Sequence, residues 1–165
     1  MHNLMKKQLL VLTCLIAVLL TSCLSDDYVD RNSIDQQIIQ EYIQEKGLTL
    51  EYDANSGIHY KIIRLGDTTR RPSPDSSQIT VNYEGRLLTD TIFVKGDSVE
   101  MDLARQPIGF QLGVSSIGEG GEIMMILPSL VSYGSASFVT DTPYSVLVPP
   151  FSVLVYEVEL LKVGE

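Results

Sequence analysis

The chain of 165 residues contains no tryptophan, two cysteines and two histidines. A Ser-His-Asp or Cys-His mechanism would depend on one or two side chains, and a zinc site would be short of ligands. Basic residues are also scarce, since 12 Lys and Arg face 21 Asp and Glu. This balance argues against nucleic-acid binding, because phosphate contacts need a surplus of basic side chains. The remaining composition, 44% apolar and 20% charged, suits one globular core, and we expect neither a metal nor a cofactor.

The first 22 residues have the pattern of a secretory signal. Two lysines precede an almost continuous apolar run at 9–20, which is shorter than the roughly 20 residues that a membrane-spanning helix needs. The run ends in LTSC at 20–23, which resembles the lipobox of bacterial lipoproteins, where the cysteine becomes the acylated first residue. We therefore expect Cys23 to carry lipid and to anchor the protein at the outer membrane of a bacterial cell envelope. The alternative is a plain signal peptide with an incidental cysteine.

Removal of residues 1–22 changes the chemistry that the chain can offer. Residues 23–165 have a net charge of −11, and no thiol remains for a disulfide, a metal site or a nucleophile once Cys23 is acylated. His59 is then the last histidine, and it lies in an alternating segment, so we interpret it as an ordinary strand residue. Residues 23–32 are polar and acidic, as in a flexible tether. An acidic stretch after the cysteine also resembles the surface-export signal of Bacteroidetes-type lipoproteins, so periplasmic and surface-facing anchors both stay open.

The segment 33–47 predicts a short amphipathic helix. Ser33 can cap its N-terminus, Gln36 can reach back to that cap, and Lys46-Gly47 is a stop signal. Apolar residues at 34, 38, 39, 42 and 43 form a stripe at helical spacing. Such a helix must pack against something. Its own domain is the expected partner, and a second copy of the chain is the alternative.

From residue 48 onward the apolar residues recur with a period of two. This pattern predicts strands at 48–52, 58–63, 79–87, 99–103 and 154–160, and a short, nearly continuous apolar run that ends before Pro128 predicts another at 122–127. One short helix interrupts them, with Pro107 in its first turn and Phe110, Val114 and Ile117 along one face. Gly113 lies near this face, where another backbone could approach closely. Antiparallel strands around one short helix make an α+β domain, which we assign to 48–165.

Six segments, taken in order, carry a family resemblance. They are ITVNYEGRLL at 79–88, DTIF at 90–93, the stretch 106–122 with its glycine pair, ILPS and SYG between 126 and 134, LVPP at 147–150, and the closing strand 153–163. Together they resemble the FKBP-type peptidyl-prolyl isomerases over 77–163, and 48–66 resembles the lead-in strands of the lipoprotein form more loosely. The resemblance implies a curved antiparallel β-sheet wrapped on one short central α-helix, here extended by an N-terminal helix.

The resemblance also implies an activity that suits a chain poor in histidine and cysteine. The family isomerises X-Pro bonds, so we expect proline-containing polypeptides as partners and assistance to the folding of exported proteins. Rotation about the peptide bond meets a barrier of about 18–20 kcal/mol because amide resonance is lost on twisting. An apolar pocket that desolvates the amide favours the less polar twisted state, and no nucleophile or proton shuttle is needed.

The family pattern, carried over residue by residue, implies a pocket made of aromatic rings. The residues assigned to catalysis are Tyr83, Phe93, Phe110, Tyr133 and Tyr156, and those assigned to substrate binding are Gln106, Pro107, Leu147 and Val148. In this pattern the strand rings form the walls, Phe110 forms the floor, and the Tyr133 hydroxyl donates to a substrate carbonyl. Gln106 and Pro107 lie on the rim, and Leu147-Val148 closes one side with its backbone N–H groups available.

Three positions depart from the family pattern and keep other functions open. Phe110 stands where the family usually has tryptophan, Val94 where it has aspartate, and Pro107 where it has the isoleucine of a rim pair. The cavity would stay apolar but would lose a charged group at its edge. The alternatives are a peptide-binding or chaperone module without turnover, and a structural surface lipoprotein whose pocket is filled by its own side chains. Substrate preference and oligomeric state stay open.

Overall fold

The computed structural model describes residues 30–74, 78–140 and 145–164, with the backbone alone at 138. The predicted signal, most of the tether and the lipidation site Cys23 lie outside these residues. The chain divides into two units, Met1–Asp30 and Arg31–Glu165, and the second carries all the elements discussed below. Within the described ranges, none of the helices combines the length and the apolar character needed to cross a bilayer.

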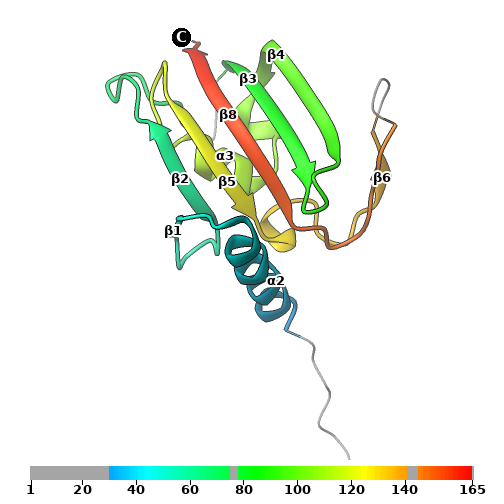
Figure 1. Cartoon of the computed structure of the whole chain (residues 1–165). Coiled ribbons are helices and arrows are strands. Elements are labelled where there is room, and N and C mark those ends of the chain that lie inside the picture. Colours follow the sequence, from blue (N-terminus) through cyan, green and yellow to red (C-terminus); the bar gives the residue numbers. More distant parts are fainter. Residues whose placement is uncertain (1–29, 75–77, 141–144, 165) are drawn as a thin grey trace, which may run out of the picture. The chain divides into compact units, whose positions relative to one another are not determined.

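The elements of the second unit form an α+β domain, as predicted. In chain order they are α2 (Arg31–Lys46), β1 (Glu51–Tyr52), β2 (His59–Arg64), β3 (Gln78–Leu87), β4 (Ile92–Asp102), the 3₁₀ turn η1 (Leu103–Arg105), α3 (Ile108–Val114), β5 (Glu122–Leu127), the 3₁₀ turn η2 (Ser129–Val131), β6 (Phe138–Val139), β7 (Leu147–Val148) and β8 (Leu154–Val163). The main sheet has the order β1-β2-β5-β8-β3-β4 and is antiparallel throughout. The β6–β7 ribbon stands apart from it at the β4 side (Figure 1).

The central helix α3 packs on one face of this sheet. Phe110 and Val114 are buried there together with every second residue of the strands, such as Met125 and Tyr156. The predicted helix face is therefore correct, but Pro107 lies just before the helix and not in its first turn. Its ψ of 144° is extended, so the helix begins only at Ile108.

Two further sequence expectations about the strands and α3 need correction. The strand predicted at 48–52 shortens to β1, and the one predicted at 99–103 is the second half of the longer β4, which ends where η1 begins. No backbone approaches Gly113 in the way we expected. The three atoms nearest to a Cβ placed there all belong to the side chain of Met125, which fills the space that glycine leaves.

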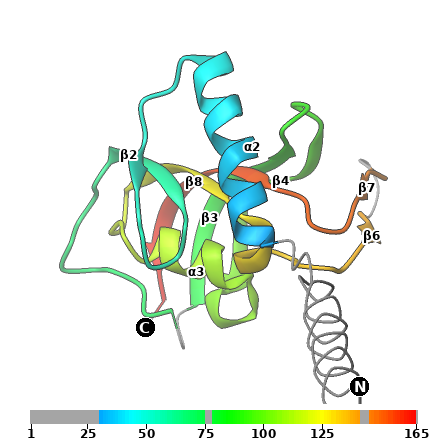
Figure 2. The same cartoon turned by 90° about the horizontal axis from the view of Figure 1, so that it is seen from below.

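Helix α2 packs on the opposite face of the same strands. Ile39 and Tyr42 are buried against Ile126, Val153 and Val155, whose neighbours in β5 and β8 point toward α3. Figure 2 shows α2 and α3 on either side of the sheet. The prediction that the N-terminal helix docks on its own domain is confirmed. Because both faces of β5 and β8 are covered, these strands are the best-buried part of the fold.

The ends of α2 differ in how well the sequence predicted them. The helix begins at Arg31, so Ser33 lies inside it and is not its cap. Gln36 does not reach back either: its Nε2 donates to the Gly57 carbonyl at 2.8 Å, and its Oε1 lies 2.8 Å from His59 Nε2. The stop signal is correct, since Gly47 follows the last helical residue with a φ of 62°, a conformation that favours glycine.

Candidate functional site

A cavity of about 270 Å³ opens on the α3 side of the sheet. Strands β3, β4 and β8, the start of α3, the turn after η2 and the β6 segment all contribute to it. The residues that line it are Tyr83, Phe93, Val94, Gln106, Phe110, Tyr133, Val139, Thr140 and Tyr156. The structure thus brings together all five residues assigned to catalysis and one of the four assigned to substrate binding.

The aromatic rings of this cavity meet edge to face. Phe110 lies 5.2 Å from Tyr156 and 6.3 Å from Tyr83 between ring centroids, with interplanar angles of 76° and 78°. Phe93 meets Tyr156 at 5.8 Å and 85°. Such contacts stabilise aromatic pairs by about 0.5–1.5 kcal/mol beyond their buried area. The rings therefore form one rigid, connected wall, and they are not dispersed over the sheet.

A buried glycine in β3 allows this wall to form. Gly85 pairs with Tyr156 on one side and with Val94 on the other. A Cβ at this position would lie 2.7 Å from Tyr156 Cε1, 2.8 Å from Phe93 Cζ and 2.8 Å from Val94 Cγ1. The pairing of β3 and β4 also shifts register on either side of this region, and such irregularities re-aim side chains. In the sequence, a glycine inside a strand pattern is the feature that indicates such a close approach of neighbouring groups.

The polar groups of the cavity are mainly tyrosine hydroxyls. Those of Tyr133 and Tyr156 lie 3.5 Å apart. Burial raises the pKa of Tyr156 well above its ordinary value, with the nearby Tyr133 as a second cause, and burial also raises the pKa of Tyr83. These two hydroxyls therefore stay protonated at neutral pH. Tyr133 is 36% exposed and lines the cavity, so this residue is in contact with both the cavity and solvent.

The structure places the other three predicted substrate residues outside the cavity lining. Pro107 adjoins Gln106 and precedes α3. Leu147 is largely exposed, and Val148 is 1% exposed because its side chain packs in the core. The β6 side supplies the wall instead, through Val139 and Thr140.

The sequence predicts Val94 at the edge of the pocket but does not assign Val139 or Thr140 to it. Val94 had been noted as the position where the family has aspartate, so a signal for it existed. Val139 is the last residue of the two-residue strand β6, and Thr140 follows it. So short a segment has no recognisable alternation of apolar and polar residues.

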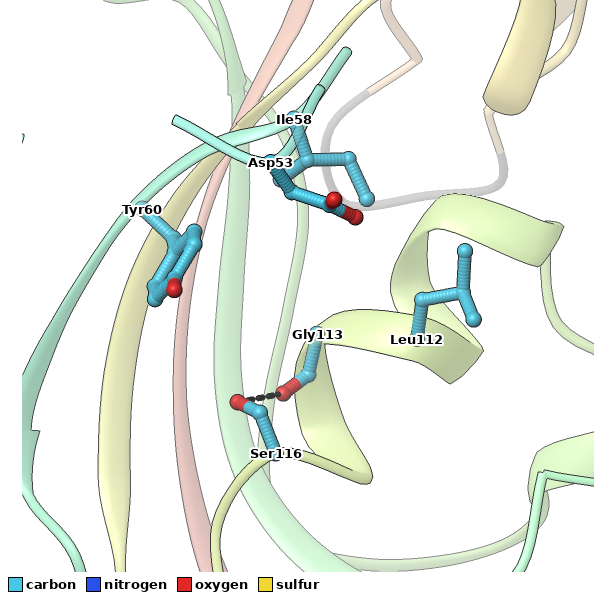
Figure 3. A pocket seen from close by; sticks show the side chains of 6 residues that line it. All are labelled: Asp53, Ile58, Tyr60, Leu112, Gly113 and Ser116. Atoms are coloured by element: carbon cyan, nitrogen blue, oxygen red, sulfur yellow. Dashed lines mark hydrogen bonds between the residues drawn. The ribbon is translucent and has the colours of Figure 1, made fainter. Parts of the chain in front are cut away.

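A smaller cavity of about 130 Å³ lies between the β1–β2 hairpin and α3 (Figure 3). Its polar groups are engaged with their neighbours: Ser116 Oγ donates to the Gly113 carbonyl at 2.6 Å, and the Asp53 carboxylate accepts from Ser56 Oγ. That hydrogen bond lowers the pKa of Asp53. These hydrogen bonds stabilise local turns, and we assign no catalytic role to this smaller cavity. Within the described ranges, no three metal-ligating side chains come together.

Comparison with known proteins decides the family. The model of the FKBP-type peptidyl-prolyl cis-trans isomerase domain matches residues 69–161, more than half of the chain. The chain belongs to the FKBP family. FkpA of Escherichia coli K12 is 28% identical over 142 residues, covering 83% of this chain and 48% of FkpA. A probable FkpA of Neisseria meningitidis is 33% identical over 113 residues, covering 66% and 39%. This FKBP chain thus spans about half the length of these relatives or less.

Solved FKBP structures share the fold described above. The crystal structure of FkpA from Escherichia coli superposes with a TM-score of 0.63 at 24% identity, over 97% of this chain and 71% of that one. A peptidyl-prolyl cis-trans isomerase from Pseudomonas syringae gives 0.61 at 21% identity, over 81% and 96%. The predicted FKBP-like fold is therefore confirmed.

Proposed function

We propose that this FKBP domain isomerises X-Pro bonds in exported polypeptides and so assists their folding. The observation that carries the proposal is the cavity in which five aromatic side chains from five separate segments meet and which opens to solvent. Its volume of about 270 Å³ suits a ring the size of proline. Membership of the FKBP family supports the same reading.

The geometry favours the twisted state of the prolyl bond by desolvation. A proline seated against the Phe110 ring would be enclosed by Tyr83, Phe93 and Tyr156, and the amide would lose contact with water. The planar amide is the more polar state, so it loses more from this transfer than the twisted one does. Each 1.4 kcal/mol of such preference raises the rate about tenfold.

Hydrogen-bond donors at the mouth of the cavity would orient the substrate chain. The hydroxyl of Tyr133, a partly exposed residue of the cavity lining, is suited to donate to a carbonyl next to the proline. Gln106 and Thr140 also contribute polar side chains to the cavity lining. We retain Pro107, together with the backbone of Leu147 and Val148, as contacts for residues that flank the proline, since they adjoin the rim.

A protease-coupled assay on a tetrapeptide with one X-Pro bond tests the activity. We expect the purified domain to accelerate isomerisation above background. Tyr133→Phe should reduce kcat/KM roughly two- to tenfold, the effect of one neutral hydrogen bond. Tyr60→Phe is the matched control, since its hydroxyl contacts Glu51 on the far hairpin. A folded protein that gives the background rate would disprove the enzymatic proposal.

A non-catalytic peptide-binding module is the second candidate. One observation favours it: the side chain at the cavity edge is Val94, where the family resemblance leads one to expect a carboxylate. In this case calorimetry would detect binding of a proline-containing peptide, while the assay would show no acceleration. Tyr133→Phe would then weaken binding without any effect on a rate.

We also propose that the mature chain is a lipoprotein of the bacterial cell envelope, attached through Cys23 at the outer membrane. The support is the lipobox-like LTSC at 20–23, followed by an acidic segment. Metabolic labelling with a clickable fatty acid should mark the wild type and leave Cys23→Ser unlabelled. Protease shaving of intact cells then separates a surface-facing anchor from a periplasmic one.

A further inference from the structure

A carboxylate that is completely buried joins helix α2 to the turn at the mouth of the cavity. Asp35, on the second turn of α2, is 0% exposed. Its Oδ2 accepts two hydrogen bonds from Ser129, from the backbone N–H at 2.8 Å and from Oγ at 2.6 Å. Its Oδ1 lies 2.6 Å from Arg31 Nη2. These contacts connect residues 94 positions apart in the sequence.

This arrangement is better suited to fixing geometry than to adding stability. A buried ion pair loses hydration, and well-packed apolar residues of similar volume are often as stabilising or more so. Two hydrogen bonds to one carboxylate oxygen and an ion pair on the other restrict where Ser129 can lie. We therefore expect these contacts to fix the geometry of the segment that begins at Ser129.

That segment runs from Ser129 to Gly134 and carries Tyr133. The Ser129 carbonyl accepts hydrogen bonds from the N–H groups of Ser132, at 3.1 Å, and Gly134, at 2.8 Å. Tyr133 stands between these two donors, and its side chain lines the cavity. Once Ser129 is fixed, the backbone on both sides of Tyr133 is fixed with it.

The first turn of α2 also holds the far end of this segment. Arg31 Nη2 donates to the Phe151 carbonyl at 2.7 Å, and its guanidinium lies 5.1 Å from the centroid of the Phe151 ring. The Phe151 N–H in turn donates to the Gly134 carbonyl at 2.7 Å. Asp35 pairs with the same Arg31, so one carboxylate supports both ends of the turn.

We infer that Asp35 is a positioning residue that holds the Tyr133 hydroxyl in place at the cavity, acting through Ser129 and Arg31. This inference rests on the proposed isomerase function and extends it to the face of the sheet opposite the cavity. Asp35 touches no substrate. Its effect passes from α2 through η2 to the cavity.

A double-mutant cycle with Tyr133→Phe tests the inference. We expect Asp35→Ala to lower kcat/KM roughly two- to tenfold, and by no more than Tyr133→Phe does, because it acts by displacing that hydroxyl from the reacting centre. In the Tyr133→Phe background the same change should have little effect, since the hydroxyl it positions is gone. Asp35→Asn should restore part of the activity, because its amide oxygen can still accept from Ser129 while the ion pair with Arg31 is lost. Ile39→Val is the control, since it weakens α2 packing without touching Ser129.

Hydrogen exchange supplies a second measurement that does not depend on turnover. In Asp35→Ala the amides of Ser132 and Gly134 should exchange at least tenfold faster, and in Ile39→Val they should not. If Asp35→Ala does not fold, Ser129→Ala serves in its place, since it loses only the hydroxyl bond and keeps the buried pair.

The outcomes separate failure of this inference from failure of the proposed function. An equal loss of kcat/KM in both backgrounds would overturn it, since Asp35 would then act without Tyr133. Unchanged exchange at Ser132 and Gly134 would overturn it as well. A wild type without isomerase activity would end the proposed function, and the exchange rates alone would then decide whether Asp35 holds the turn.

Discussion

Replacing Gly85 with alanine tests the aromatic cavity directly. Gly85 is buried and does not have a positive φ, so alanine can adopt its backbone conformation without strain. The added methyl group would lie within 2.8 Å of Tyr156, Phe93 and Val94, closer than real Cβ atoms approach other groups. The substitution therefore changes packing alone, at the point where the rings meet.

The expected magnitude follows from the lack of space behind the rings. Phe93 and Tyr156 are each 2% exposed and are in contact with one another, so neither can withdraw into the core. Overpacking of this kind costs about 1–3 kcal/mol in stability. The open direction is the cavity, where displaced rings would oppose substrate binding by a similar amount. The corresponding loss in kcat/KM is roughly five- to 150-fold.

The assay compares Gly85→Ala with Gly113→Ala. Far-ultraviolet circular dichroism during urea unfolding gives stability, and the protease-coupled assay gives kcat/KM. At Gly113 the crowding atoms belong to Met125, a flexible side chain, and alanine is about 1 kcal/mol better than glycine in a helix. We expect Gly113→Ala to keep wild-type kcat/KM. A folded Gly85→Ala protein with wild-type kcat/KM would refute the assignment of these rings to the substrate pocket.

Three further predictions follow from the rings and from the buried His59. Phe110→Leu should lower stability by about 1–3 kcal/mol, because two edge-to-face contacts of about 0.5–1.5 kcal/mol each are lost, and kcat/KM should fall with it. The kcat/KM of the wild type should show no titration of Tyr83 or Tyr156 between pH 6.5 and about 9, because burial raises both pKa values. Burial lowers the pKa of His59, so the unfolded chain binds its proton more readily and the free energy of unfolding should fall as pH drops below about 6.5.

Each of these predictions can be contradicted by a specific result. Phe110→Leu with unchanged stability would show that the ring contacts contribute nothing. A tyrosine titration in the pH profile that disappears in Tyr156→Phe would contradict the pKa direction. For the histidine, His59→Gln keeps a donor toward Gln36 Oε1 and should lose this part of the pH dependence in urea titrations at pH 5.5 and 7.5. An equal dependence in both proteins would assign it to other groups.

Local patterns were enough to predict most elements of the fold. The alternation at 154–160 predicted most of β8, because a strand with a period of two places its apolar residues on one face. The nearly continuous apolar run at 122–127 predicted β5, as expected for a strand that is buried on both faces. The stripe in α2 predicted a helix, and the order of motifs predicted the five rings of the cavity. Boundaries were less accurate: α2 begins at Arg31, two residues before the predicted start, and the side chain of Arg31 bonds to Phe151, a residue 120 positions away.

The part of the pocket that the sequence did not predict depends on long-range packing. Val139 and Thr140 line the cavity, and the side chains of Leu147 and Val148 do not. Which side chains of the β6–β7 ribbon face the cavity depends on the pairing of two strands that are each two residues long. The role of Gly85 depends on its register against β4 and β8 at the same time. No local pattern contains that information.

By itself the sequence determined the family, through the resemblance carried by the order of its motifs, and its few histidines and thiols are compatible with the proposed isomerisation by desolvation. Tertiary structure alone decided how the rings are supported. Asp35 looks like an ordinary polar residue of an amphipathic helix, and only the folded chain places it, fully buried, against Ser129. The physical reason is that periodicity reports which face of an element is buried, whereas partners across the sheet are set by topology.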